Sequence, residues 1–239
     1  MLLRGLQKTT LLDFPGKVAC TVFTGGCNFR CPFCHNASLI ENLASDERLS
    51  EENFFAFLDK RRGLTDGVCI TGGEPLLQRE FLVDLLRECK SRGIHTCLDT
   101  SGVGDGDYSE ILSLTSLVLY DVKAVSDGAY REITGRPIDA TEEFQRAMRD
   151  ARVPVVVRQV VIPGINDTDE YMSSLRDYIM EKIPGCVGVE LLPYHKMGSH
   201  KYDKLGLVEP YRDVPPMDKD RTDAFYGKYF KNEFGEYEN

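Results

Sequence analysis

Residues 24–36 read TGGCNFRCPFCHN and contain three cysteines, Cys27, Cys31 and Cys34, within one short loop. Cysteine thiolates bind iron–sulfur clusters, and a [4Fe-4S] cluster held entirely by protein needs four of them. The next cysteine lies far along the chain, on another predicted strand. The loop therefore predicts a cluster with one iron left open, as catalytic metal sites keep a position open for substrate.

Short apolar runs that predict strands alternate with amphipathic segments that predict helices. Six such units predict a parallel sheet covered by helices. Because eight units close a standard barrel, six predict an open, partial (β/α)6 TIM-like barrel of the α/β class. We predict strands at residues 18–23, 67–71, 94–100, 117–122, 154–162 and 188–193. We predict helices at residues 51–62, 80–92, 108–114, 129–133, 141–152 and 168–183.

Two residues mark expected helix ends. Ser50 precedes the first helix and is expected to cap it with its hydroxyl. Gly93 follows the second helix, where a left-handed residue commonly ends a helix.

The length and composition predict one domain over residues 1–239. The chain is 42% hydrophobic and 28% charged, which suffices for one sizeable core. The polar and aromatic residues 197–239 are expected to form a C-terminal cover or docking segment. No apolar run reaches the roughly 18 residues of a membrane span, and the beginning does not resemble a signal peptide. We therefore expect a cytoplasmic protein.

Charge and cysteine usage narrow the function further. The 29 Lys and Arg are outnumbered by 38 Asp and Glu, and no basic stretch offers a phosphate-binding surface, so no nucleic-acid partner is expected. Eight cysteines in a chain of this size without an export signal are expected to be reduced. Those outside the loop are expected to act as buried apolar groups: Cys20, Cys69, Cys89, Cys97 and Cys186.

A zinc site completed by His35 is the alternative for the cysteine loop. Structural zinc sites usually combine ligand pairs separated by a longer spacer. His35 is adjacent to Cys34, which makes joint ligation strained. The spacing therefore favours the cluster.

Polar residues follow several predicted strands at their carboxyl ends, where functional residues gather in a barrel. The glycines after the second strand would let the backbone approach a ligand closely, and the glutamate there adds charge. The candidates are Gly72, Gly73 and Glu74, then Asp99, Thr100 and Ser101, then Asp121, Val122 and Lys123, and finally Arg158 and His195.

Each candidate has a structural alternative. The GGE sequence could be an ordinary turn, and Lys123 could form a weak surface ion pair with Asp121. Arg158 lies inside an apolar strand and needs a partner, either in the site or on a neighbouring strand-end carboxylate. A single histidine such as His195 is often structural.

The Cys27-x3-Cys31-x2-Cys34 pattern, with Phe33 before the last cysteine, resembles the signature of the radical S-adenosylmethionine (SAM) superfamily. Within it, residues 13–216 are similar to the activating enzymes of glycyl radical enzymes. The resemblance implies a radical SAM fold, a [4Fe-4S] cluster on the three cysteines, and SAM. The implied SAM-site residues comprise Phe33, Cys34 and His35 and the strand-end candidates above.

The resemblance also implies roles for individual residues. The GGE stretch would hold the methionine end of SAM, and Lys123 would contact the methionyl carboxylate. His195 would lie against SAM. Asp99 and Asp121 would also hold a monovalent cation.

The implied activity is reductive cleavage of SAM to generate a glycyl radical on a partner such as pyruvate formate-lyase or a relative. No side chain would serve as a general acid or base. A flavodoxin or ferredoxin would supply the electron, and the chain would be a monomer. Candidate contacts to the partner are the basic and aromatic residues near the mouth of the barrel, Lys196, His200, Lys201 and Tyr202.

The two ends of the chain resemble different activating enzymes. MGxxKYxxLG at residues 197–206 and RDVPP at residues 212–216 resemble the pyruvate formate-lyase group, whereas LDFPG at residues 12–16 is more like activators of anaerobic ribonucleoside-triphosphate reductase. A small-molecule radical SAM enzyme like 7-carboxy-7-deazaguanine synthase and a non-catalytic iron–sulfur electron carrier are further alternatives.

Overall fold

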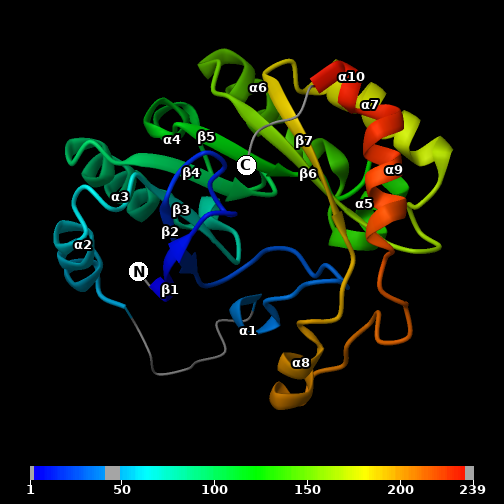
Figure 1. Cartoon of the computed structure of the whole chain (residues 1–239), viewed down its shortest axis with the longest axis horizontal. Helices are drawn as coiled ribbons and strands as arrows, with labels where there is room; N and C mark the ends of the chain where they lie inside the picture. The colour runs from blue at the N-terminus through cyan, green and yellow to red at the C-terminus, as the bar shows by residue number, and fades with distance from the viewer. Residues whose placement is uncertain (1–2, 41–48, 235–239) are drawn as a thin grey trace.

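The computed structural model describes residues 3–40 and 49–234. Its strands form one sheet in the order β1 to β7, with β1 and β7 at the two edges (Figure 1). Strands β2 to β7 are parallel, and β1 pairs antiparallel with β2. The predicted open α/β barrel of six parallel strands is confirmed. The strands are β1 Leu3–Thr10, β2 Ala19–Thr24, β3 Gly67–Gly72, β4 His95–Thr100, β5 Leu117–Asp121, β6 Val155–Val161 and β7 Cys186–Pro193.

Helices cover the outer face of the sheet, and the predicted ones all appear within a few residues of their expected bounds. The Ser50 hydroxyl accepts a hydrogen bond from the Asn53 amide at 3.1 Å, and Gly93 is left-handed (φ 69°), both as predicted. The helices are α1 Ala37–Ile40, α2 Glu51–Lys60, α3 Arg79–Ser91, α4 Ser109–Leu114, α5 Asp127–Thr134, α6 Glu142–Ala151, α7 Asp169–Lys182, α8 Ser199–Leu205, α9 Lys219–Tyr229 and α10 Lys231–Phe234, with 3-10 turns η1 Pro75–Gln78 and η2 Ile138–Thr141.

The edge strand β1, the short helix α1 and the C-terminal helices α8, α9 and α10 were not predicted from the sequence. β1 mixes basic and polar residues, as is common in strands at the edge of a sheet, and on its outer side Leu3 forms a bridge with Leu49. Helix α9 packs against β7 and α7 (Figure 1). The last five residues of the predicted cover segment, 235–239, lie outside the described residues, and its docking role stays a prediction.

An apolar layer closes the barrel at the amino ends of the strands. Phe14, only 3% exposed, lies there with Cys69, Cys97 and Leu117. Gly67 makes room for it, since a Cβ atom at this position would lie 2.6 Å from the Phe14 ring. Of the cysteines predicted to be buried apolar groups, Cys186 is half-buried, and the others are fully buried: Cys20, Cys69, Cys89 and Cys97.

Candidate active site

The cysteine loop leaves the carboxyl end of β2 and is closed by backbone hydrogen bonds. The Gly26 amide donates to the Leu39 carbonyl at 2.7 Å, and the Cys34 amide donates to the Cys31 carbonyl at 3.1 Å. Cys27, Cys31 and Cys34 are partly buried and form no disulfide. The fold therefore presents three free thiols at one place, on the edge where the sequence predicted the site.

The electrostatics of the loop suit cationic iron. Burial raises the pKa of all three thiols, to about 12 for Cys31. The Lys123 ammonium lowers these pKa values, whereas the charges of Cys27 and Cys34 raise that of Cys31 further. Three thiolates at this place need positive charge beside them. Metal ions supply that charge when they replace the thiol protons. The donor set thus fits an iron–sulfur cluster.

The arrangement gives no support to the zinc alternative. Among the described residues, no three His, Cys, Asp or Glu side chains are grouped to bind a single metal ion. In a [4Fe-4S] cluster each cysteine binds a different iron, so the sulfurs need not converge on one point.

The two glycines after β3 are required by the fold itself. Gly72 has a φ of 123°, and a Cβ atom there would overlap the backbone of Thr24. A Cβ atom at Gly73 would overlap the backbone of Gly26, at the start of the cysteine loop. The Glu74 amide also donates to the Gly26 carbonyl at 2.8 Å. The glycines allow β3 to approach the cysteine loop, in addition to any approach to a ligand.

Glu74 joins two of the predicted site segments. It is 1% exposed, and its carboxylate accepts hydrogen bonds from the Thr100 hydroxyl at 2.5 Å and the Ser101 amide at 2.9 Å. It also accepts from the Leu76 amide at 3.1 Å. Burial raises the pKa of Glu74 to about 7, against these hydrogen bonds and the Lys123 charge, which lower it. Glu74 therefore holds the β3 and β4 ends together, and its predicted contact with SAM stays a prediction.

Arg158, on β6, bridges a carboxylate on β4 and another on β7. Its guanidinium lies 3.3 Å from Asp99 and 3.3 Å from Glu190. The Thr71 hydroxyl donates to Asp99 at 2.8 Å. Burial raises the pKa of Asp99, and Arg158 opposes it. The salt-bridge alternative for Arg158 is present, and sequence analysis missed Glu190, although its charge inside an apolar strand is the same signal.

Lys123 and Asp121 form a partly buried pair at 2.8 Å, with side chains 12% and 28% exposed. Burial raises the pKa of Asp121, but Lys123 and Arg158 outweigh it and lower the pKa. The pair is therefore more than a surface contact. Val122, the residue between them in the sequence, is buried, and its amide donates to the Arg158 carbonyl at 2.9 Å. Asp99 already pairs with Arg158, and Asp121 with Lys123. The monovalent cation expected at these two carboxylates stays a prediction.

The predicted residues from the two ends of the chain meet. The rings of His35 and His195 stack with their centroids 4.0 Å apart. Phe33 is buried beside Tyr211, and the Lys123 ammonium lies 5.8 Å from the centre of its ring. The structure thus brings His195 to the cysteine loop, and its predicted contact with SAM stays a prediction.

Two of the residues expected to contact a partner also contact the cysteine loop. Lys201 donates hydrogen bonds to the His35 carbonyl at 3.0 Å and the Asn36 side chain at 2.9 Å. Tyr202 is 7% exposed and donates to the Cys34 carbonyl at 2.9 Å. Their contact with a partner stays a prediction, and no local sequence pattern indicates that helix α8 lies against this loop.

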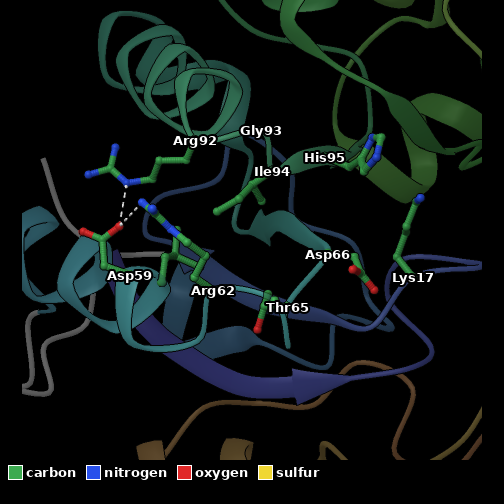
Figure 2. A pocket seen from close by; sticks show the side chains of 11 residues that line it. Lys17, Asp59, Arg62, Thr65, Asp66, Arg92, Gly93, Ile94 and His95 are labelled. Carbon is green, nitrogen blue, oxygen red and sulfur yellow. Dashed lines mark ion pairs between the residues drawn. The ribbon is translucent and has the colours of Figure 1, made fainter.

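A separate hollow of about 280 Å³ lies at the amino ends of β3 and β4 (Figure 2). Arg62 and Arg92 both reach Asp59 there, at 3.6 and 3.4 Å. Lys17 and His95 line the same hollow. None of the predicted site residues lies there. The candidate site is at the opposite, carboxyl ends of the strands.

Comparison with known proteins assigns the class. The sequence profile of the Radical SAM superfamily matches residues 21–175. The structure of Streptococcus suis SuiB bound to precursor peptide SuiA is similar to this chain with a TM-score of 0.66 and 15% identity, over 89% of this chain and 45% of that one. The chain belongs to the radical SAM superfamily, whose members use a [4Fe-4S] cluster, as the cysteine loop predicted, and SAM, as the resemblance implied.

Relatives of nearly the same length narrow the comparison. The chain is 40% identical over 235 residues to the pyruvate formate-lyase-activating enzyme of Clostridium pasteurianum, covering 96% of each chain. It is 33% identical to the enzyme of the same name from Staphylococcus epidermidis, over 94% of this chain and 93% of that enzyme. The resemblance to activating enzymes stated from the sequence is confirmed.

Proposed function

We propose that this protein is an activating enzyme that cleaves SAM reductively and generates a glycyl radical on pyruvate formate-lyase or a relative. The observation that carries the proposal is the near full-length similarity to pyruvate formate-lyase-activating enzymes, at 40% identity for the Clostridium pasteurianum enzyme. The three-cysteine loop at the carboxyl edge supports it, because it leaves one iron free for SAM. When bound, the cluster supplies the electron that breaks a carbon–sulfur bond of SAM.

The chain's own residues would bind and orient these groups. Cys27, Cys31 and Cys34 would hold the cluster, and Lys123 beside them would attract the methionyl carboxylate. Thr100 and Ser101 are fixed by Glu74, which gives the β4 end a defined position next to the loop. Because hydrogen abstraction by a radical needs no general acid or base, none of these residues is given that role.

The partner's glycine segment would enter at the open edge of the sheet. A cavity of about 470 Å³ lies there between β7, α9 and the loop after β1, and Asp13, Arg158, Glu190 and Tyr226 contribute to its lining. Its mixed polar and apolar wall suits a peptide. The C-terminal segment would cover this side of a single domain, and the chain would act as a monomer.

The electron donor and the cellular location are part of the same proposal. A flavodoxin or ferredoxin would reduce the cluster, in the cytoplasm. No helix within the described part of the chain is both long and apolar enough to cross a membrane.

The partner is tested by electron paramagnetic resonance. The reconstituted, reduced chain is incubated with SAM and either pyruvate formate-lyase or anaerobic ribonucleoside-triphosphate reductase. A glycyl radical signal on the former alone is expected. A signal on the latter alone would reassign the partner in favour of the LDFPG resemblance.

A further inference from the structure

The segment that follows β7 reaches back to the cysteine loop. We call residues 194–211 the α8 segment. The Tyr202 side chain forms a hydrogen bond with Cys34, although 168 positions separate the two residues in the sequence. Helices α8 and α1 lie side by side (Figure 1). The cysteine loop is therefore held from a distant part of the chain.

The contact consists of directed hydrogen bonds to the backbone after the third cysteine. The Tyr202 hydroxyl donates to the Cys34 carbonyl at 2.9 Å, and the Lys201 ammonium donates to the His35 carbonyl at 3.0 Å. The same ammonium donates to the Asn36 side chain at 2.9 Å. Successive carbonyl groups are thus fixed on either side of the His35 Cα atom.

Packing leaves no slack between the two segments. The gap between them has room for about 10 Å³ of water-sized centres, no more than one water molecule. A Cβ atom at Gly198 would lie 3.0 Å from the His35 Cα atom, so the backbones are close. The His195 ring stacks on His35, and the His195 carbonyl lies 3.1 Å from the Nε2 atom of His35. Movement of the loop would break all of these contacts.

The donors are themselves held in place. Helix α8 ends at Gly206, which is left-handed (φ 66°), and the Leu207 amide donates to the Tyr202 carbonyl at 3.0 Å. The Ser199 hydroxyl donates to Glu209 at 2.6 Å. The α8 segment is therefore preorganised, which is what support for a functional site requires.

We infer that Lys201 and Tyr202 are positioning residues that hold the cysteine loop in the conformation that binds the cluster. By fixing the carbonyls of Cys34 and His35, they fix the direction of the Cys34 thiol. Outer partners of this kind commonly set metal affinity. The inference rests on the proposed cluster site and assigns a role to residues outside it.

The test compares Tyr202→Phe and Lys201→Met with a matched control, Tyr229→Phe. Tyr229→Phe also removes a hydrogen bond of a tyrosine hydroxyl, the 2.8 Å bond from Tyr229 to Asp169, but on helix α9 and not at the loop. The reconstituted proteins, without SAM or partner, are exposed to a ferrous chelator. Iron release should be about five-fold faster in Tyr202→Phe, which loses one hydrogen bond, and about 25-fold faster in Lys201→Met, which loses two. Tyr229→Phe should match the wild type.

Hydrogen exchange on the cluster-free chain separates positioning from general destabilisation. Exchange at residues 27–40 should rise in both α8 variants, while exchange in α3 and the melting temperature stay unchanged. Lys201→Arg keeps the charge and the donor groups and should release iron more slowly than Lys201→Met. If Tyr202→Phe fails to fold, Lys201→Met carries the test, since its apolar stem is retained.

Wild-type iron release and exchange in the α8 variants would overturn the inference. That outcome would leave the proposed function standing, because the proteins would still hold a cluster. A chain that takes up no cluster in any form would instead contradict the proposed function.

Discussion

The two ends of the same parallel strands differ in chemistry. At their amino ends, Phe14 seals the barrel over Cys69, Cys97 and Leu117. At their carboxyl ends lie charged side chains that pair with one another, as in the Asp99–Arg158–Glu190 chain.

The difference shows which end is built for stability and which for chemistry. Apolar side chains stabilise a core without needing partners. Buried charges are tolerated only when they are paired. Replacing a whole pair by apolar residues is often neutral or stabilising, whereas removing one partner destabilises the fold. The charges around Arg158 are therefore best explained by the site that they surround.

The largest effect is expected at the apolar end. Phe14→Ala should lower the free energy of unfolding by about 4 kcal/mol, because it removes a buried ring and leaves a cavity. Urea unfolding of the cluster-free chain measures this. Iron content after reconstitution should stay at the wild-type level, and its loss would contradict the separation of the two ends.

Gly73→Ala should lower the free energy of unfolding by about 3 kcal/mol and greatly reduce iron uptake, because the new methyl group would overlap the Gly26 backbone. Iron content and urea unfolding check the two effects. Gly227→Ala is the matched control, since nothing lies within 4 Å of a Cβ atom there, on α9. Full iron uptake by Gly73→Ala would show that the loop can shift freely.

Arg158→Met should lower the free energy of unfolding by about 3 kcal/mol, because it leaves Asp99 and Glu190 without their cation. Thermal and urea unfolding measure this. Lys228→Met breaks a pair of similar length, 2.9 Å to Asp169, between exposed side chains, and should unfold like the wild type. Equal effects of the two changes would contradict the special status of the carboxyl end.

The smallest effect concerns pH. Burial raises the pKa of Glu74 from 4.5 to about 7, so the folded chain keeps a proton there that the unfolded chain has lost. The free energy of unfolding should therefore fall as pH rises through this range, by about 1 kcal/mol for each pH unit between about 5 and 6.5.

Glu74→Gln should remove this contribution, whereas Glu80→Gln, on the exposed face of α3, should keep it. Urea unfolding at several pH values compares the three proteins. An identical pH dependence in wild type and Glu74→Gln would show that the pKa of Glu74 is not raised.

The strands and helices of the barrel could be predicted because each has a local signal. Ser50 caps α2, and Gly93 takes the left-handed conformation that ends α3. Strand β1 could not, because LRGLQKTT carries no alternating apolar pattern. Its place is decided by pairing with β2, which is a tertiary contact.

The site could be predicted as far as strand ends identify it. The sequence located Asp99, Lys123 and Arg158 at one edge, because parallel strands end together. It could not predict that Tyr202 turns back to Cys34, since such contacts depend on how distant segments pack. Whether these residues bind SAM stays a prediction.

The most direct test is SAM cleavage by the reconstituted chain after reduction with dithionite without oxygen, followed as 5′-deoxyadenosine. We expect cleavage by the wild type and none by Cys27→Ala, Cys31→Ala or Cys34→Ala. Phe14→Ala, folded at low temperature, should retain cleavage. Absence of 5′-deoxyadenosine from a fully loaded, reduced wild-type cluster would contradict the account and favour an electron carrier.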